Sequence, residues 1–349
     1  MRAVVFLGER ELDFLDFPDP TPGPGEVVLE MKASGMCGSD LKFYRAPKGG
    51  GTAALGLGAL SGPVIGGHEP CGVVAAVGAG VGQAQARVGD RVMVHHYKGC
   101  GVCKHCRVGW SQLCGEGIVV YGATGHGAHA PWMKVPASTL VPLPAALSFE
   151  TGAAISCGTG TAYGALKRLD PSGRDTIAIF GQGPVGLAAT QLAAAMGARV
   201  IALDTEPQRL ERAKAFGAAA VVNPGSNDPV AAIKELTHGE GAEKTLDCSG
   251  HPLARAQAVR AARTWGQCCF VGEGENVTLD VSPDMLRRQI TIHASWTFST
   301  VGQGECAEFV ADRGIDVDKL FTHRWKLPQA REAYQLFDQQ SSGKGVFLF

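Results

Sequence analysis

Residues 176–186 read TIAIFGQGPVG, an apolar run that ends in a glycine-rich turn. The run predicts a buried β-strand, and the apolar residues after the turn predict a helix over 187–196. The turn fits G-x-G-x-x-G, whose glycines allow a tight turn, a close approach of the backbone to a pyrophosphate, and close packing of helix on strand. Together they predict a dinucleotide-binding unit whose cofactor contacts are Gly181, Gly183, Pro184, Val185 and Gly186.

The second strand of that unit ends in an acidic residue. Asp204 follows the apolar run at 199–203, and Thr205 comes next, where an enzyme that uses NADP often has arginine. A carboxylate in this place accepts hydrogen bonds from the adenosine ribose and repels a 2′-phosphate. We therefore expect NAD as the cofactor, with Asp204 and Arg209 among its contacts. In a simpler alternative, Asp204 only caps the helix that begins near residue 208.

Strands and helices continue to alternate as far as residue 271. Such alternation predicts a parallel sheet with helices on both faces, which is the α/β class. The runs predicted as strands lie at 199–203, 220–222, 244–248 and 268–271, and the helical segments between them lie at 209–216, 229–236 and 252–263.

The chain before residue 150 has a different pattern. Short β-rich runs at 25–33, 71–77 and 90–95 are separated by prolines, which predicts an irregular β domain. A helix at 329–340 and a strand at 346–349 are expected to return to that domain. The glycine-rich stretch Gly49–Gly62 is expected to form a surface loop.

Four cysteines crowd into one short loop. Cys100, Cys103, Cys106 and Cys114 have the close spacing with which thiolates wrap a single zinc ion. Four protein ligands leave no open coordination position, so this zinc is expected to be structural. The loop also carries basic residues, but it lacks the ββα pattern of a zinc finger that reads bases.

Composition excludes several classes of partner. The 349 residues carry a formal net charge of -1, so the chain lacks the excess of positive charge that is typical of proteins that bind nucleic acid or an anionic membrane. No apolar stretch is long enough for a signal peptide or a membrane span. The expected setting is the cytoplasm, and the expected partner is a small molecule.

Further ligand-type residues stand in three separate segments. Cys37 lies in GMCGSD (35–40), His68 and Glu69 lie in GGHEP (66–70), and Cys157 lies in ISCGTG (155–160). Taken singly, a cysteine is usually a small buried apolar residue, and a histidine beside glycines can belong to a surface turn.

Together with the glycine turn and the cysteine loop, these segments make the whole chain resemble the medium-chain dehydrogenase/reductase family, close to its zinc-dependent alcohol, polyol and threonine dehydrogenases. The resemblance implies a GroES-like domain at 1–157 and 298–349, and a Rossmann domain at 158–297 that binds NAD. It implies two zinc ions per chain and reversible, NAD-linked oxidation of an alcohol, favouring a secondary alcohol or a polyol, to the carbonyl compound.

The resemblance also assigns roles to the dispersed ligands. Cys37, His68 and Cys157 would bind a catalytic zinc, with Asp40 orienting His68 and Glu69 as an alternative ligand. Three protein ligands leave a position for the substrate oxygen, and whether Glu69 or water fills it at rest is open. Zinc would lower the pKa of a bound alcohol, whose hydride would pass to the nicotinamide.

The proton path departs from the family pattern. Ser39 matches the hydroxyl that takes the alcohol proton, but Lys42 replaces the histidine that often ends the relay. The proton would then leave by water, by the ribose hydroxyls or through another histidine. His126 and His129 are the candidate histidines, although both also read as ordinary loop histidines.

Other residues match the nicotinamide side of the cofactor site. Trp296 and Phe298 would either shape the substrate pocket or pack in the core. The residues that match cofactor contacts are Thr161, Val271, Gly272, Ser295 and Trp296.

Two alternatives remain beside this hypothesis. A zinc-free reductase of activated double bonds, of the enoyl or quinone type, would share the fold but would need none of the dispersed ligands. A non-catalytic zinc protein would use only the cysteine loop. The resemblance further implies a homodimer or a homotetramer.

Overall fold

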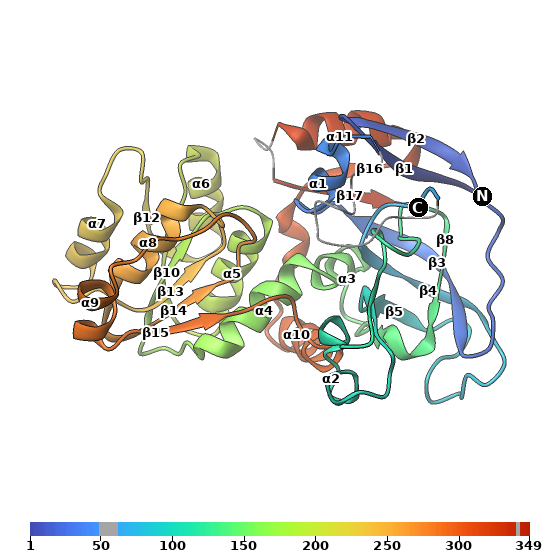
Figure 1. The fold of residues 1–349 in the computed structure, drawn as a ribbon, viewed down its shortest axis with the longest axis horizontal. Helices are drawn as coiled ribbons and strands as arrows, with labels where there is room; N and C mark the ends of the chain where they lie inside the picture. The colour runs from blue at the N-terminus through green and yellow to red at the C-terminus, as the bar shows by residue number, and fades with distance from the viewer. Residues whose placement is uncertain (49–61, 340–342) are drawn as a thin grey trace. The chain divides into compact units, whose positions relative to one another are not determined.

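The computed structural model describes residues 1–48, 62–339 and 343–349, so the predicted glycine-rich loop lies outside the described residues except for Gly62. The chain divides into two compact units. The first contains Met1–Cys157 and Ser299–Phe349, and the second contains Gly158–Phe298. Figure 1 labels the elements of both units.

The second unit contains a six-stranded sheet in which every pair of neighbouring strands is parallel. The strand order is β12-β11-β10-β13-β14-β15, so the chain runs outward from β10 and then returns to β13. The edge where the carboxyl ends of β10 and β13 meet is the switch point of a doubly wound sheet. The bounds are β10 Thr176–Phe180, β11 Arg199–Leu203, β12 Ala218–Val222, β13 Ala242–Asp247, β14 Ala262–Phe270 and β15 Thr291–Ala294.

Helices connect these parallel strands. Because crossovers are right-handed, reversing the direction of winding at the switch point puts the connecting helices on opposite faces of the sheet. Four of the helices begin with proline, whose fixed φ suits the first helical turn. The bounds are α4 Gly158–Leu169, α5 Pro184–Ala195, α6 Pro207–Ala215, α7 Pro229–Leu236, α8 Pro252–Ala261 and α9 Val281–Asp284.

The start of α5 corrects the sequence-based boundary. The helix was expected from residue 187, but Gly183 is the N-cap and Pro184 is the first helical residue. Proline is favoured at this position because its missing N–H would have no helical partner there. Gly186 therefore lies in the first turn of the helix rather than before it.

The first unit is built on a mixed sheet in the order β16-β17-β3-β4-β5-β9, with β8 also paired to β3. Strand β17, near the C-terminus, pairs with β3 through Val346↔Gly35 and Phe347↔Ser34. The bounds are β1 Arg2–Gly8, β2 Glu11–Asp16, β3 Glu26–Gly35, β4 Glu69–Val77, β5 Arg91–Val94, β6 Tyr97–Lys98, β7 Val119–Val120, β8 Trp132–Pro136, β9 Leu140–Pro142, β16 Phe321–Trp325 and β17 Lys344–Leu348.

Helix α11 packs against one side of this unit. Its buried residues Ala330, Ala333, Tyr334 and Phe337 follow the spacing of one helical face, which packs on β17 and on the short helix α1. Among the described residues, no helix has both the length and the apolar composition to cross a membrane. The helices are α1 Asp40–Arg45, α2 Lys104–Arg107, α3 Phe149–Ile155, α10 Thr300–Asp312 and α11 Ala330–Asp338.

Candidate active site and metal centres

The dispersed ligand-type residues meet in the first unit. Cys37 follows β3, and Glu69 opens β4, where it pairs with the last residue of β3. Cys157 follows α3, which packs on β3 and β4. The ligand atoms of Cys37, His68, Glu69 and Cys157 all lie within 4.8 Å of one another. The pairing of two strands and the packing of one helix thus assemble the cluster.

The two thiols of the cluster are hydrogen-bonded to each other. Their Sγ atoms lie 3.9 Å apart. The hydrogen bond from Cys157 is the largest cause of a pKa of Cys37 well below its usual value, and the same bond raises the pKa of Cys157. A dication would allow both thiols to be deprotonated, and sulfur and nitrogen are the ligands that zinc prefers. The donor set therefore fits zinc.

Asp40 fixes the orientation of His68. Its Oδ1 lies 2.8 Å from His68 Nδ1, and its Oδ2 accepts a hydrogen bond of 2.8 Å from the backbone N–H of Cys37. Burial lowers the pKa of His68, but the charges of Asp40 and Cys37 outweigh burial and raise it. With Nδ1 facing Asp40, His68 Nε2 faces the cluster.

Ser39 lies against the same cluster. Its Oγ donates to Cys37 Sγ at 3.3 Å and lies 3.1 Å from His68 Nε2. The serine precedes α1 without capping it by a side-chain hydrogen bond, so its hydroxyl is directed to the ligands.

Glu69 has a partner that the sequence did not indicate. Lys344 Nζ lies 2.7 Å from Oε1 and 2.5 Å from Oε2 of Glu69, and it also donates to the carbonyl of Met36. Burial raises the pKa of Glu69 to about 8, and the lysine opposes that shift. The lone signal in the sequence is a lysine at the head of the apolar strand 344–349.

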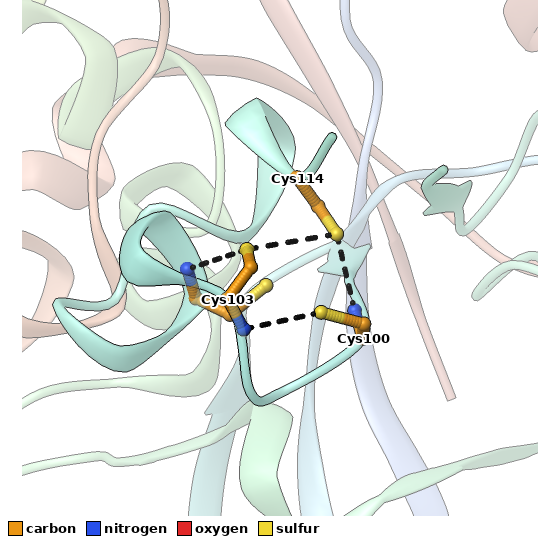
Figure 2. Close-up of side chains that lie close together, drawn as sticks. Cys100, Cys103 and Cys114 are labelled. Atoms are coloured by element: carbon orange, nitrogen blue, oxygen red, sulfur yellow. Dashed lines mark hydrogen bonds between the residues drawn. The ribbon is translucent and has the colours of Figure 1, made fainter. Parts of the chain in front are cut away.

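The four cysteines predicted as a second cluster also come together. Their sulfur atoms lie within 4.8 Å of one another. Figure 2 shows backbone N–H groups that donate to these sulfurs, from Cys103 to Cys100 and from Cys100 to Cys114, each at 3.3 Å. A hydrogen bond from the N–H of Cys106 is the largest cause that lowers the pKa of Cys103 to about 6. Such N–H donors favour thiolates, as a closed four-sulfur zinc site requires.

The glycine turn of the second unit has the geometry that its sequence predicted. Gly181 adopts φ 88°, and a Cβ at Gly186 would collide with the carbonyl oxygen of Gly181. A Cβ at Gly183 would meet nothing within 4 Å. The backbone before the N-terminus of α5 is thus uncovered, and the free N–H groups of that terminus suit a phosphate.

Asp204 lies beside this turn and does not cap α6. Its carboxylate accepts from the N–H of Gln182 at 2.7 Å and from the N–H of Glu206 at 2.9 Å, while Arg209 Nη1 lies 3.6 Å away. The N-cap of α6 is Glu206, so the simple helix-cap alternative is wrong. An ionised carboxylate offers about four acceptor sites, so two backbone bonds leave capacity for a ribose.

The remaining residues matched to the cofactor follow neighbouring strands or lie on α4. Val271 and Gly272 follow β14, Ser295 and Trp296 follow β15, and Thr161 lies on α4. The carboxyl ends of parallel strands share one edge, which also carries Gly181 and Asp204. Trp296 is 42% exposed and its indole donates to Glu273, whereas Phe298 is 1% exposed and packs in the core.

The two candidate relay histidines differ in their surroundings. His126 is exposed, with its ring edge-on to the Phe17 ring. His129 lies in a loop, as expected, and its ring is fully buried and hydrogen-bonded. Its ring is connected to the cluster by hydrogen bonds through Tyr334 and Asp40, and Tyr334 is a residue that sequence reasoning missed.

Comparison with known proteins decides the family. Residues 23–145 match the family model of the alcohol dehydrogenase GroES-like domain, and residues 184–313 match that of zinc-binding dehydrogenases. The uncharacterized zinc-type alcohol dehydrogenase-like protein YphC of Escherichia coli (strain K12) is 39% identical over 100% of this chain and 99% of its own length. This chain belongs to the zinc-type alcohol dehydrogenases of the medium-chain dehydrogenase/reductase family.

Two further proteins show the breadth of this similarity. The sorbitol dehydrogenase of Bacillus subtilis (strain 168) is 33% identical over 96% of this chain and 93% of its own length. The structure of alcohol dehydrogenase TADH from Thermus sp. ATN1 has a TM-score of 0.89 and 28% identity, and covers 100% of this chain and 99% of that chain. The predicted fold, a GroES-like domain with a Rossmann domain, is confirmed. Membership makes the chain an oxidoreductase of a family that acts on small-molecule alcohols, which favours an enzyme over a non-catalytic zinc protein.

Proposed function

We propose that this chain is an NAD-linked alcohol dehydrogenase whose catalytic zinc is held by Cys37, His68 and Cys157. The observation that carries the proposal is the convergence of these ligand atoms, from three separate segments, within 4.8 Å. The proposed substrate is a secondary alcohol or a polyol, because a sorbitol dehydrogenase is among the relatives that match nearly the whole chain.

The proposed cofactors supply the chemistry that protein side chains lack. When bound, zinc supplies a Lewis acid for the substrate oxygen, and NAD supplies the hydride acceptor. Ser39 would take the hydroxyl proton of the alcohol at Oγ while passing its own hydroxyl proton outward to water, a role supported by its contact with Cys37 and its short distance to His68. Asp40 holds the ring of His68 so that Nε2 remains directed at the cluster.

Lys344 holds Glu69 beside the proposed metal position, where Glu69 is the partner of the lysine and not a metal ligand. The lysine donates a hydrogen bond to Oε1 of the carboxylate and lies beside Oε2. With Glu69 paired in this way, three protein ligands leave one coordination position for the substrate oxygen.

The second unit is the proposed NAD-binding domain. The uncovered backbone at Gly183 and the N-terminus of α5 would hold the pyrophosphate, and the carboxylate of Asp204 would accept from the ribose. Cys100, Cys103, Cys106 and Cys114 would hold a second, structural zinc. We propose pairing of subunits along β15, the edge strand of this sheet, in a homodimer or a homotetramer.

A panel of secondary alcohols and polyols, assayed with NAD and with NADP by the absorbance of the reduced cofactor, tests the proposal. Turnover is expected with NAD, and Cys37→Ala is expected to abolish it while the fold is retained. Cys306→Ala is the matched control, because Cys306 is a buried cysteine of the same unit outside both clusters. Full activity of Cys37→Ala would refute the proposed ligands.

A further inference from the structure

A row of buried hydrogen bonds runs from the metal cluster into the core of the first unit. Tyr334 OH donates to Asp40 Oδ2 at 3.1 Å. His129 Nε2 lies 2.7 Å from the same hydroxyl, and His129 Nδ1 lies 2.8 Å from Ser34 Oγ. The side chains of Ser34, His129, Tyr334 and Asp40 belong to residues that are 0% exposed.

In each hydrogen bond of this row, the donor points toward the Asp40 end of the row. A carboxylate only accepts, so the Tyr334 proton lies toward Asp40 and the hydroxyl oxygen accepts from His129 Nε2. His129 Nδ1 then accepts from Ser34. In the other neutral tautomer of His129, Nε2 would accept the proton of the Tyr334 hydroxyl. The oxygens of Tyr334 and Asp40 would then face each other without a hydrogen between them.

Aromatic packing holds the row in place and keeps it dry. The Phe6 ring meets the Tyr334 ring edge-on at a centroid distance of 4.9 Å, and the Phe347 ring meets His129 at 4.8 Å. In such surroundings a missing partner is not replaced by water, so each hydrogen bond restrains the next group.

His129 also supports the segment that carries His68. The N–H of His129 donates to the carbonyl of Gly66, and the N–H of Ala128 donates to the carbonyl of Gly67. Gly67 adopts φ +85°, and a Cβ there would collide with the His129 ring. The glycines before His68 thus let this segment lie directly against His129.

We propose that Tyr334 and His129 are positioning residues of the metal centre, which hold Asp40 and thereby fix the orientation in which His68 presents Nε2 to the metal. The inference rests on the proposed ligands Cys37, His68 and Cys157. Asp40 bonds to the backbone of Cys37 as well as contacting His68, so a shift of Asp40 would disturb two ligands together. The row extends this support to α11, near the end of the chain.

Release of metal to a chelator tests the proposal on the holoenzyme. Partners beyond the ligands typically change metal affinity about 10- to 100-fold. Tyr334→Phe removes only the hydroxyl, and we expect about tenfold faster loss of the active-site metal and an altered absorption spectrum of the cobalt-substituted site. Release from the four-cysteine site is the internal reference and should be unchanged.

Tyr44→Phe is the matched control. Tyr44 is buried against the Tyr334 ring, at a centroid distance of 5.6 Å, but lies outside the row. This variant should retain metal as the wild type does, and unfolding of the metal-free forms measures any general loss of stability. His129→Gln, which keeps an N–H donor for Tyr334, should retain metal better than His129→Phe.

The outcomes separate the inference from the proposed function. Metal release and a cobalt spectrum of Tyr334→Phe that match the wild type would overturn the inference alone. Equal acceleration at both metal sites would show general opening and would also overturn it, as would His129→Gln behaving like His129→Phe. A wild-type protein that binds no metal at Cys37, His68 and Cys157 would remove the proposed function and the inference together.

Discussion

Lys344 and Glu69 form an ion pair in which both side chains are buried. The two side chains are 2% and 0% exposed, and the ammonium lies 2.7 and 2.5 Å from the carboxylate oxygens. Each residue opens a strand, β17 and β4, and both strands pair with β3. The pairing of both strands with β3 therefore brings the two side chains together. The ion pair has no net charge and lies next to His68.

Removal of the lysine should be costly. Lys344→Met leaves Glu69 buried without a counter-charge, and breaking such a pair typically lowers the free energy of unfolding by about 3–5 kcal/mol. Denaturant unfolding measures the loss. The double variant Lys344→Met/Glu69→Gln should recover much of it, because no charge is then left buried.

An exposed ion pair provides the comparison for that experiment. Lys214 lies 2.7 Å from Glu211 on the surface of α6. Lys214→Met should change the free energy of unfolding by less than about 0.5 kcal/mol, because solvent screens the pair. Similar losses for Lys344→Met and Lys214→Met would contradict the role given to the buried pair.

The four-cysteine site should contribute to stability and not to the chemical step. Cys103→Ala is expected to lose one zinc and to lower the midpoint of thermal unfolding, because a structural metal contributes its binding energy to folding. The neighbouring Val102 is 67% exposed, so Val102→Ala serves as the control and should leave both quantities unchanged. An unchanged midpoint in Cys103→Ala, measured by calorimetry, would argue against a metal in this loop.

The cofactor preference should depend on the charge of Asp204. Asp204→Asn keeps an acceptor for a backbone N–H but removes the charge that binds the ribose and repels a 2′-phosphate. A charged hydrogen bond contributes about 1.5–3 kcal/mol, so KM for NAD should rise about tenfold or more while NADP becomes a better substrate. Glu206→Gln removes an exposed charge two residues away and should leave the ratio of kcat/KM for the two cofactors unchanged. A wild-type enzyme that prefers NADP would be incompatible with this role of Asp204.

Acid should destabilise the fold through a buried histidine. Burial lowers the pKa of His95 to about 4, against opposing hydrogen bonds with Gln112 and Gln303. The unfolded chain, with a histidine pKa of about 6.5, therefore binds more protons between these values, and stability falls as the pH falls through that window. Between pH 7 and 4.5 the wild type should lose about 2 kcal/mol more than His95→Gln, which cannot titrate. Parallel curves of unfolding free energy against pH for the two proteins would contradict the assignment.

Local patterns predicted the alternating strands and helices and the four-cysteine loop, because each depends on residues close together in the sequence, whereas the dispersed ligands Cys37, His68 and Cys157 were assigned by the resemblance to the family. The glycine turn and its flanking strand lie within a few residues of each other, so each supports the prediction of the other. The four cysteines of the loop are likewise recognised by their close spacing.

Tyr334 and Lys344 were missed because α11 and the pairing of β17 with β3 bring them to Cys37 from the far end of the chain. The burial of His129 was not predicted because its neighbours in sequence are small loop residues, whereas its ring packs on Phe347 and Tyr334.

In the proposed enzyme, Cys37, His68 and Cys157 hold a metal distinct from that of the four-cysteine loop. Zinc counted per chain by atomic emission, in the wild type and in Cys37→Ala, tests it most directly. Two zinc ions per chain are expected in the wild type and one in the variant, with the remaining zinc in the cysteine loop. One zinc in the wild type, or two in Cys37→Ala, would contradict it.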